Sequence, residues 1–562
     1  MTLSDLVQEP LRTSDPEALH WSASAEVVVV GFGCAGATAA LQARELGADV
    51  LLVDRFDGGG ATAFSAGIYY AGNTRYQREA GFEDTPSDMF DYLVQEIGDA
   101  VTPGTLRRFC EQSAENFDWL EQHGVPFNGA YYGGKAIFPP RDKYLYYSGN
   151  EKLERYARSA KPAPRGHRFY GKGLTGTVFF QALRNAVERA HIPVARHARV
   201  VRLVVDSAGT VVGIEVLEMP DEHREAHQGF YDLVHPFKPF AFEETNRAIA
   251  DCERLERQVG RRRLIRARKG VILTTGGFAY NLDLLRQYLP KYAASASSML
   301  RMGSLACVGS GHQLGRTVGA ELRNMHRPFA GRSISPPFEL LYGIVVNSDG
   351  RRFINEDVYS ATLGEAIADQ RDSAAWLVLD ATTFWKALWK LLPRGDGNFM
   401  QWSMPTLLNV LFGGTRSART LEALAAKCGI HSRGLREEAD QYNARADART
   451  ADPFDKLAEY IRPLRGRRFY AINMALQNKF SFTLFFTLGG IRVDEATGLT
   501  LRADGSPVRG LYAAGRAAIG LCANTYACSG ISLADGVFSG RRAARHCVSG
   551  KSEDAAPVMV AA

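Results

Sequence analysis

The glycines of Val30-Gly31-Phe32-Gly33-Cys34-Ala35-Gly36 are the first residues whose type and spacing indicate chemistry. A phosphate cradle needs glycine where the chain turns sharply, where a diphosphate approaches the backbone and where the helix packs on the strand, which are Gly31, Gly33 and Gly36 here. The helix that follows offers free N–H groups and a positive dipole end to the diphosphate. Asp54, at the end of the next apolar run, can accept the ribose hydroxyls and disfavours a 2′-phosphate. The segment therefore predicts a dinucleotide site, to which Cys34, Ala35 and Arg55 would also contribute.

A second loop of small residues, Gly58-Gly59-Gly60-Ala61-Thr62-Ala63-Phe64-Ser65-Ala66-Gly67, follows this run directly. Small side chains let the backbone approach a flat ring system closely. Enzymes that bind NAD usually lack such a loop, so the predicted cofactor is FAD. The expected contacts in the loop are Gly60, Ala61, Thr62, Ser65, Ala66 and Gly67.

Apolar runs on both sides of these loops predict the sheet that positions them. Residues 27–30 and 49–54 predict two parallel strands joined by a helix over 37–46, which is the opening of a doubly wound sheet. Residues 192–217 alternate apolar and polar about a turn at 206–209 and predict a hairpin. Further strands are expected at 271–275 and 510–515, and a helix at 532–546.

Strands of one sheet thus lie far apart in the sequence, so the simplest architecture is α/β with an inserted domain. We predict a Rossmann-like, doubly wound FAD-binding domain built from residues 1–280 and 481–562, with an α+β catalytic cap domain over 281–480. A chain of 562 residues is too long for one ordinary core, which agrees with this division.

Two stretches look like additions to this plan. Residues 218–263 are densely charged and predict a helical excursion on the hairpin. Residues 384–414 contain Trp385, Trp389 and Trp402 among leucines and lysines, a pattern typical of a helix lying in a lipid headgroup layer. A cap helix packed within the protein, or a subunit contact, explains the same pattern, so both interpretations stay open.

Composition excludes several classes of function. The formal net charge of +6 is small for this length and no basic stripe with interleaved aromatics occurs, so no nucleic-acid partner is expected. The eight cysteines form no C-x-x-C pair and no zinc-like spacing with histidine, so we expect reduced thiols and no metal. There is no secretion signal and no unbroken run of about 18 apolar residues. The expected location is the cytoplasm, with peripheral contact to the inner membrane through 384–414 left open.

Six short motifs follow one another in order along nearly the whole chain. With them the chain resembles the 3-ketosteroid dehydrogenase family of the fumarate reductase and succinate dehydrogenase flavoprotein superfamily. The motifs are Gly59-Gly60-Ala61-Thr62 with Ser65-Ala66-Gly67, Thr275-Gly276-Gly277-Phe278, Gly309-Ser310-Gly311-His312, Phe353-Ile354-Asn355-Glu356, Thr487-Leu488-Gly489-Gly490 and Ala513-Ala514-Gly515-Arg516. The resemblance implies an FAD-binding domain with a catalytic cap. It adds as cofactor contacts Val200, Val201, Thr275, Gly276, Gly277, Gly515, Arg516, Ser532 and Leu533.

Two segments argue against the dicarboxylate enzymes of this superfamily. Those enzymes carry a histidine pair before the T-x-G-G segment and an arginine in the C-terminal loop. This chain has Phe485-Phe486 and Asn524-Thr525-Tyr526 instead. Burying two carboxylates without a charged clamp is prohibitive, so fumarate or succinate is not expected as the substrate.

Within the family, the chain is most similar to the bacterial enzymes that desaturate steroids between carbons 4 and 5. The resemblance rests largely on Glu356-Asp357-Val358-Tyr359-Ser360 and Tyr526-Ala527-Cys528-Ser529-Gly530. It implies that Tyr359 and Tyr526 are catalytic. The family motif is Y-A-S-G, and the extra residue here leaves two candidates for the third member. Ser529 keeps the serine–glycine register, whereas Cys528 keeps the distance from the tyrosine.

The implied reaction removes two hydrogens beside the 3-keto group of a steroid. Tyr526 and the backbone N–H of Gly530 would hold the carbonyl oxygen, Tyr359 would take the proton from carbon 4 and the flavin the hydride from carbon 5. A tyrosine with a pKa of about 10 needs a relay to act as a base near neutral pH, and Ser360, Cys528 and Ser529 are the candidates. The electrons would pass to a quinone or a soluble carrier.

Three alternatives stay open. The first is a 1-dehydrogenase of the same family, which acts between carbons 1 and 2 and for which the Tyr131-Tyr132 loop could supply a tyrosine. The spacing of Glu356 and Tyr359 favours the 4-dehydrogenase, because a longer gap is expected in the 1-dehydrogenases. The second is another flavin reductase of the superfamily, and the third is a flavin-binding protein without steroid chemistry.

Overall fold

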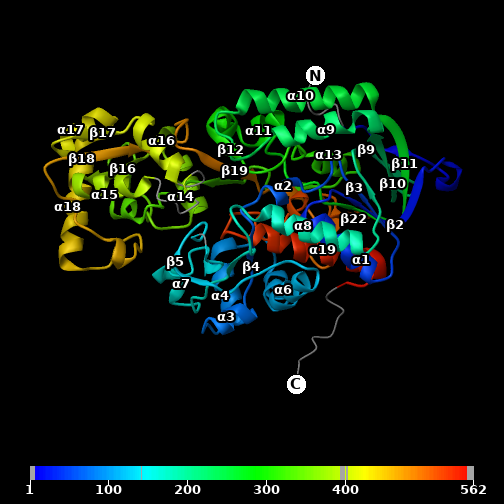
Figure 1. The fold of residues 1–562 in the computed structure, drawn as a ribbon, viewed down its shortest axis with the longest axis horizontal. Coiled ribbons are helices and arrows are strands. Elements are labelled where there is room, and N and C mark those ends of the chain that lie inside the picture. Colours follow the sequence, from blue (N-terminus) through cyan, green and yellow to red (C-terminus); the bar gives the residue numbers. More distant parts are fainter. Residues whose placement is uncertain (1–6, 141, 393–398, 400–402, 553–562) are drawn as a thin grey trace.

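The computed structural model describes residues 7–140, 142–392, 399 and 403–552. Figure 1 shows an elongated molecule with a larger part and a smaller part, the latter coloured mainly yellow. The sheet of the smaller part consists of β15 (Ile344–Val346), β16 (Trp376–Asp380), β18 (Phe469–Asn473) and β17 (Arg416–Ala418), in that order. Its helices are α14 (Ser360–Asp369), α15 (Ala381–Leu391), α16 (Met404–Phe412), α17 (Leu421–Cys428) and α18 (Ser432–Ala448). The domain limits 1–280, 281–480 and 481–562 stay a prediction.

A nine-stranded sheet forms the centre of the larger part. Its main path is β1-β9-β10-β11-β2-β3-β8, with β22 paired to β11 and β21 paired to β22. The strands are β1 (Leu11–Arg12), β2 (Ala23–Val30), β3 (Val50–Val53), β8 (Val194–Ala195), β9 (Ala198–Val205), β10 (Val211–Glu218), β11 (Arg261–Leu273), β21 (Leu499–Leu501) and β22 (Pro507–Ala513). β2 runs parallel to β3 and β11, β11 runs parallel to β22, and β9 and β10 form the expected hairpin. The predicted α/β class is confirmed, and strands far apart in the sequence belong to one sheet, as expected.

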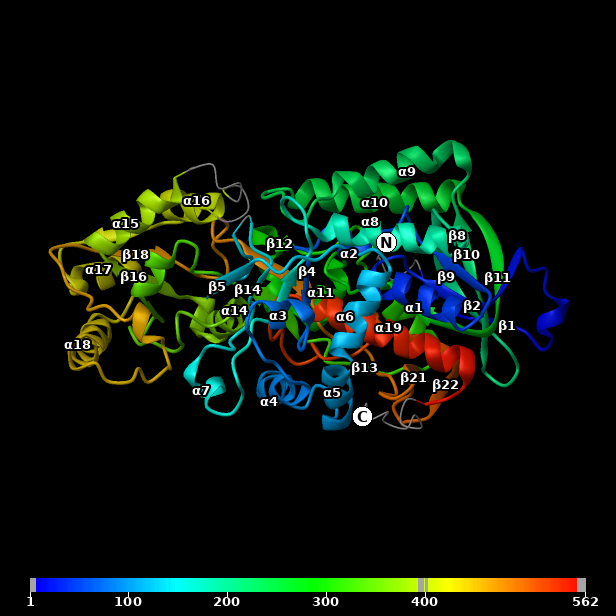
Figure 2. The same ribbon diagram turned by 60° about the horizontal axis from the view of Figure 1, so that its bottom comes forward.

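Helices α1 (Cys34–Glu45) and α19 (Ile531–Ser549) pack on the face of β2 that presents Val27 and Val29. Figure 2 shows them near each other in the larger part, although they come from opposite ends of the chain. Small residues permit the close packing, because a Cβ on Gly540 would lie only 2.6 Å from the carbonyl oxygen of Ala35. The two helix N-termini therefore reach the same region of the sheet.

The charged insertion is helical, as predicted. It consists of α9 (Asp221–Leu233) and α10 (Phe242–Val259), which connect β10 to β11 and lie along one side of the larger part in Figure 1.

Shorter elements complete the larger part. The small strands are β4 (Ile68–Tyr70), β5 (Tyr131–Lys135), β6 (Leu145–Tyr147), β7 (Gly166–Arg168), β12 (Met299–Arg301), β13 (Leu322–Arg323), β14 (Pro328–Gly331), β19 (Thr483–Thr487) and β20 (Gly490–Ile491). The other helices are α2 (Gly60–Ala63), α3 (Arg75–Glu79), α4 (Pro86–Ile97), α5 (Pro103–Glu111), α6 (Ser113–Gln122), α7 (Glu154–Ala157), α8 (Gly176–Arg189), α11 (Leu282–Tyr288), α12 (Pro290–Ala294) and α13 (Ser310–Thr317). All eight cysteines are free thiols, as expected.

The tryptophan-rich stretch supplies α15 and α16. Phe384, Ala387 and Leu391 of α15 are buried against the smaller part, whereas the side chains of Trp385 and Trp389 are 56% and 66% exposed. Trp402 lies outside the described residues. Within the described part of the chain, no helix is both long enough and apolar enough to cross a membrane.

Candidate active site

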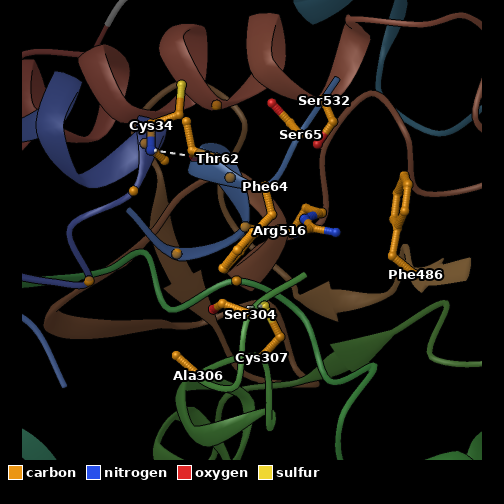
Figure 3. A pocket seen from close by; sticks show the side chains of 18 of the residues that line it. Cys34, Thr62, Phe64, Ser65, Ser304, Ala306, Cys307, Phe486, Arg516 and Ser532 are labelled. Carbon is orange, nitrogen blue, oxygen red and sulfur yellow. Dashed lines mark hydrogen bonds between the residues drawn. The ribbon is translucent and has the colours of Figure 1, made fainter. Parts of the chain in front are cut away.

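A cavity lies where the N-termini of α1 and α19 meet the loops that follow β3 and β11. Figure 3 shows Cys34, Thr62 and Ser532 on the helix side and Ser304, Ala306 and Cys307 on the opposite side. The residues predicted from sequence that line it are Gly31, Gly33, Cys34, Ala35, Asp54, Arg55, Gly60, Ala61, Thr62, Ser65, Ala66, Gly67, Val200, Thr275, Gly276, Tyr359, Gly515, Arg516, Tyr526, Ser529, Gly530, Ser532 and Leu533. The structure thus gathers them around one cavity, while their roles in binding and catalysis stay predictions.

The turn between β2 and α1 has the conformation that a phosphate cradle requires. Gly31 has a φ of 106°, and a Cβ there would lie 2.7 Å from the carbonyl oxygen of Thr274, so no other residue fits without strain. The N–H of Cys34 donates to Oγ1 of Thr62 at 2.9 Å, which ties the first turn of α1 to the second glycine loop (Figure 3). Helix N-terminal N–H groups without a partner in the helix can then bind an anion.

Asp54 is fixed beside this turn. Its carboxylate accepts hydrogen bonds from the N–H groups of Phe32 at 2.6 Å and Phe56 at 2.8 Å. Burial raises the pKa of Asp54, and the two backbone bonds oppose that shift. Each oxygen keeps a lone pair with which it can accept a ribose hydroxyl.

A buried ion-pair cluster borders the cavity near Asp54. Glu256 of α10 accepts hydrogen bonds from Arg55 at 2.6 Å and from Arg199 at 2.9 Å, and all three side chains are more than nine-tenths buried. Both arginines line the cavity. Burial alone would raise the pKa of Glu256, but the two guanidinium groups outweigh it and hold the pKa well below its ordinary value. The charged insertion therefore supports the cavity wall, because Glu256 holds both arginines in place, a role that the sequence did not indicate.

Three possible metal ligands meet in the same cluster. One ligand atom each of His227, Cys252 and Glu256 lies within 4.8 Å of the others. Two guanidinium groups already neutralise Glu256, and their positive charge repels a metal cation. The cluster is better explained as a buried ion-pair network than as a metal centre.

The donor set of the cavity fits FAD. Oγ1 of Thr275 is buried and has no hydrogen-bond partner among the described residues, although Thr275 lines the cavity. A Cβ on Gly60 would meet nothing within 4 Å, so the backbone there is open to a ligand. With the α1 turn for a diphosphate and Asp54 for a ribose, these residues match the parts of a flavin dinucleotide.

Tyr359, Ser529 and Ile137 form a hydrogen-bonded chain at one corner of this cavity. The hydroxyl of Tyr359 lies 3.0 Å from Oγ of Ser529, which donates to the carbonyl oxygen of Ile137 at 3.1 Å. The hydroxyl of Tyr146 donates to the same carbonyl at 3.0 Å. Because the hydroxyl of Ser529 donates its hydrogen bond to Ile137, its oxygen can accept a hydrogen bond from the hydroxyl of Tyr359.

Tyr526 stands next to this chain, in an aromatic corner. Its ring meets the rings of Phe329 and Phe486 edge to face, at centroid distances of 4.9 and 5.1 Å, and lies 6.3 Å from the ring of Tyr359. The guanidinium group of Arg516 lies over Phe486 at 4.8 Å, as Figure 3 shows. The corner thus has apolar walls, and its polar groups are the two phenol hydroxyls, Oγ of Ser529 and the guanidinium group of Arg516.

The backbone N–H of Ser532, in the first turn of α19, interacts with the hydroxyl of Tyr526 and opposes the rise of its pKa. The turn into α19 depends on Gly530, whose φ is 99° and whose Cβ would lie 2.8 Å from the backbone nitrogen of Tyr70. Burial raises the pKa values of Tyr359 and Tyr526 far above the ordinary value of a phenol. Both tyrosines are therefore neutral hydrogen-bond donors at neutral pH.

Five residues with a role in the leading assignment lie outside the lining of the cavity: Gly36, Val201, Gly277, Cys528 and the relay candidate Ser360. Gly36 packs against the carbonyl of Gly31, and Val201 points to the sheet face opposite Val200 because strand side chains alternate. Gly277 packs against Thr487. Cys528 is fully buried between Gly149 and Tyr70.

The histidine of the Gly309-Ser310-Gly311-His312 motif also lies outside the lining of the cavity. His312 is buried, its Nε2 is 3.3 Å from the carbonyl oxygen of Gly489, and burial lowers its pKa to about 4. It is therefore neutral and packs beside the ring of Phe278.

The sequence missed much of the apolar wall. The lining residues without a role in the sequence analysis include Phe64, Ile68, Ile137, Phe237, Met302, Ser304, Ala306, Cys307, Val308, Phe329 and Leu484. Only the spacing of residues along β19 could have identified any of these lining residues from the sequence. Leu484 and Phe486 are two residues apart on β19, so they face the same side, and Phe486 replaces a histidine of the dicarboxylate enzymes.

Comparison with known proteins gives one consistent result. The FAD binding domain family matches residues 26–533. The 3-oxo-5-alpha-steroid 4-dehydrogenase of Comamonas testosteroni is 33% identical over 522 residues, which are 91% of this chain and 96% of that protein. The 3-oxosteroid 1-dehydrogenase of Mycobacterium tuberculosis is 25% identical over 93% of this chain and 98% of its own length.

Among solved structures, the 3-ketosteroid-delta4-(5alpha)-dehydrogenase of Rhodococcus jostii RHA1, crystallised with 4-androstene-3,17-dione, superposes with a TM-score of 0.77. The two sequences are 29% identical, and the match covers 96% of this chain and all of the other.

Proposed function

Because this chain belongs to the 3-ketosteroid dehydrogenase family of FAD-binding oxidoreductases, we propose that it introduces a double bond between carbons 4 and 5 of 3-ketosteroids. The observation that supports this most directly is the corner in which Tyr359 and Tyr526 stand side by side, with Ser529 behind Tyr359. Two phenols beside an apolar wall suit a flat, apolar ketone. They do not suit a dicarboxylate, because two buried carboxylates need more positive charge than the one guanidinium group, that of Arg516, at this corner supplies.

Tyr526 is proposed to hold the 3-keto oxygen. Its hydroxyl faces the N-terminus of α19, and its raised pKa keeps it a donor. The backbone N–H of Gly530 would donate to the same oxygen. As negative charge develops on that oxygen, two fixed donors and the positive helix end stabilise it.

Tyr359 is proposed to take the proton from carbon 4. A free phenolate is disfavoured at this buried position, so the phenol must hand on its own proton as it receives the new one. Oγ of Ser529 is placed to accept that proton at 3.0 Å. When bound, FAD supplies the two-electron acceptor for the hydrogen that leaves carbon 5.

The rival assignment is dehydrogenation between carbons 1 and 2 of the steroid. Tyr131 and Tyr132, which would provide its extra tyrosine, lie outside the cavity lining. Tyr131 packs against Phe82 and Tyr147 instead. This arrangement favours the 4–5 assignment.

The electron acceptor in the proposal is a quinone or a soluble carrier. Contact with a membrane surface through 384–414 is part of the same proposal. It is supported by the exposed indoles of Trp385 and Trp389 next to the exposed lysines Lys386 and Lys390.

The deciding experiment mixes the purified yellow protein with a 5α-3-ketosteroid and phenazine methosulfate and identifies the product by mass spectrometry and proton NMR. A 4-ene product supports the proposal. A 1-ene product alone would move the chain to the rival assignment, and an absence of flavin bleaching by any 3-ketosteroid would contradict both.

A further inference from the structure

A second, smaller cavity shares Tyr359 and Ile137 with the main one. Its volume is about 40 Å³. The rest of its wall includes Lys135 at the end of β5, Arg332 after β14, and Asp357 and Ser360 on either side of Tyr359. A buried water needs about 10–15 Å³ of such space, so the cavity has room for about three water molecules.

Three polar side-chain atoms of this wall are buried without a hydrogen-bond partner among the described residues. They are Nε of Arg332, Oδ1 of Asp357 and Oγ of Ser360, and the three residues are 1%, 4% and 2% exposed. Buried polar groups are nearly always bonded to protein or to ordered water. One donor, one acceptor and one hydroxyl around a small cavity provide the two to four partners that a buried water takes.

The cavity also leads from Tyr359 toward the surface. Ser333 and Ser335, which line it, are partly exposed. Asp357 is held in place because its Oδ2 accepts the N–H of Leu457 at 3.1 Å, which leaves Oδ1 for another partner. The wall between the two cavities is formed by Tyr359 and Ile137, the ends of the hydrogen-bonded chain through Ser529.

We propose that this second cavity holds water that carries the proton released by the substrate from Tyr359 to Asp357 and on to solvent. The inference rests on the proposed function, in which carbon 4 loses a proton that must leave a closed site. The C–H bond at carbon 4 breaks, its electron pair stays on the substrate to form the double bond, and its proton bonds to the oxygen of Tyr359. Tyr359, which lines both cavities, then passes a proton to the water of the second cavity and takes back the proton that Ser529 accepted. The proton on the water protonates Oδ1 of Asp357 and is then released to solvent.

The charges around Asp357 suit a group that takes up a proton and then releases it. Burial raises its pKa, and Glu356 adds to that shift, whereas Lys135 and Lys456 oppose it. Tyr460 and Arg332 also face the cavity, and Arg332 forms no ion pair with a carboxylate of the described residues. The carboxylate of Asp357 thus forms no ion pair among the described residues, but positive charge lies nearby, so it can both accept and release a proton.

Stopped-flow mixing of the FAD-loaded protein with a 3-ketosteroid tests this route, with a pH indicator dye in weak buffer. In the unchanged protein, proton appearance should keep pace with flavin bleaching. In Asp357→Asn, whose amide oxygen can still accept the N–H of Leu457, protons should appear at least about tenfold more slowly than the flavin bleaches. Ser360→Ala removes only the unpartnered hydroxyl and should show a smaller delay of the same kind. A substitution that disturbed the whole active site would instead slow flavin bleaching and proton release by the same factor.

The control is Asp349→Asn, an exposed acid of the smaller part, which should show no delay. Should Asp357→Asn fold poorly, Ser360→Ala alone decides the matter. Synchronous signals in the variants would overturn the route while leaving the proposed function intact. No bleaching of the unchanged protein by any 3-ketosteroid would instead contradict the proposed function, and with it this inference.

Discussion

The hydroxyl of Tyr359 and Oγ of Ser529 lie 3.0 Å apart although 170 residues separate them in the chain. The contact bears on the extra residue in Tyr526-Ala527-Cys528-Ser529-Gly530, because Ser529 faces the cavity while Cys528 is buried behind it. It therefore favours Ser529 as the third member of the site.

Ser529→Ala should slow flavin bleaching by a 3-ketosteroid about a hundredfold, since the acceptor of the Tyr359 proton is lost. Cys528→Ser, which changes the neighbouring residue outside the cavity, should bleach close to the rate of the unchanged protein. Rapid-mixing absorbance measures both. The reverse order of effects would place the relay at Cys528.

Tyr526→Phe removes the hydroxyl assigned to the keto oxygen and keeps the ring that packs on Phe329 and Phe486. We expect bleaching to slow about 100- to 1000-fold with the bound flavin spectrum retained. Tyr342→Phe, at a tyrosine that does not line the cavity, is the matched control. Full activity of Tyr526→Phe would remove this residue from the mechanism.

Gly31→Ala should lower the flavin content of the purified protein. The measurement is the ratio of the visible absorbance of the flavin to the ultraviolet absorbance of the protein. The new Cβ would collide with the carbonyl of Thr274 in the phosphate turn. Gly47→Ala has a similar positive φ of 83° but open space around it, so it adds strain without a collision. If both variants bind FAD equally, the turn tolerates a side chain and the cradle assignment is wrong.

Glu256→Gln should destabilise the protein by about 3–5 kcal/mol at pH 7, because it leaves Arg55 and Arg199 buried without a full negative charge. The folded pKa of Glu256 is lowered. Its stabilising effect is therefore fully present above the unfolded value of about 4.3 and is lost as pH falls from there through the folded pKa. The difference in Tm between variant and parent should shrink accordingly as the pH falls below about 4.

Glu243→Gln, at an exposed acid of the same helix, should leave Tm unchanged. An equal Tm for Glu256→Gln and its parent at pH 7 would mean that the two arginines find another partner.

The double change Trp385→Ser with Trp389→Ser should reduce sedimentation with vesicles of anionic phospholipid, because the exposed indoles insert at the headgroup layer. Tyr170→Ser changes an exposed aromatic residue of the larger part and serves as the control. Unchanged sedimentation of the double variant, or of a protein lacking 384–414, would favour the alternative of a packed cap helix.

Sequence reasoning succeeded where the chemistry is local. Gly31, Gly33, Asp54 and the loop over 58–67 follow one another closely, so spacing alone indicated that they share one site, and the cavity gathers them. That β11 and β22 belong to one sheet was also predictable, because the short apolar runs that begin at Val271 and Leu511 each lead into a glycine-containing loop.

Contacts over long sequence distances were not predictable in this way. Arg55 and Glu256 are 201 residues apart, and nothing in the charged insertion distinguishes Glu256 from its many acidic neighbours until the helix packs. Likewise Ile137 binds Ser529 only through its backbone carbonyl. Every residue has such a carbonyl, so the residue type at position 137 could not indicate this contact. The sequence could not decide whether Cys528 or Ser529 faces the cavity. That depends on the positive φ of Gly530 and hence on the path of the backbone into α19.

The position of α19 has a consequence for biosynthesis. The strand β22 and the helix α19, residues 507–549, provide a central pairing partner for β11 and one wall of the cavity. A ribosome delivers these residues long after α1, so a growing chain carries the phosphate turn of α1 before it has a complete flavin pocket. Flavin can therefore meet its whole pocket only after β22 and α19 have been synthesised, and a nascent chain that stops before them lacks that wall of the cavity.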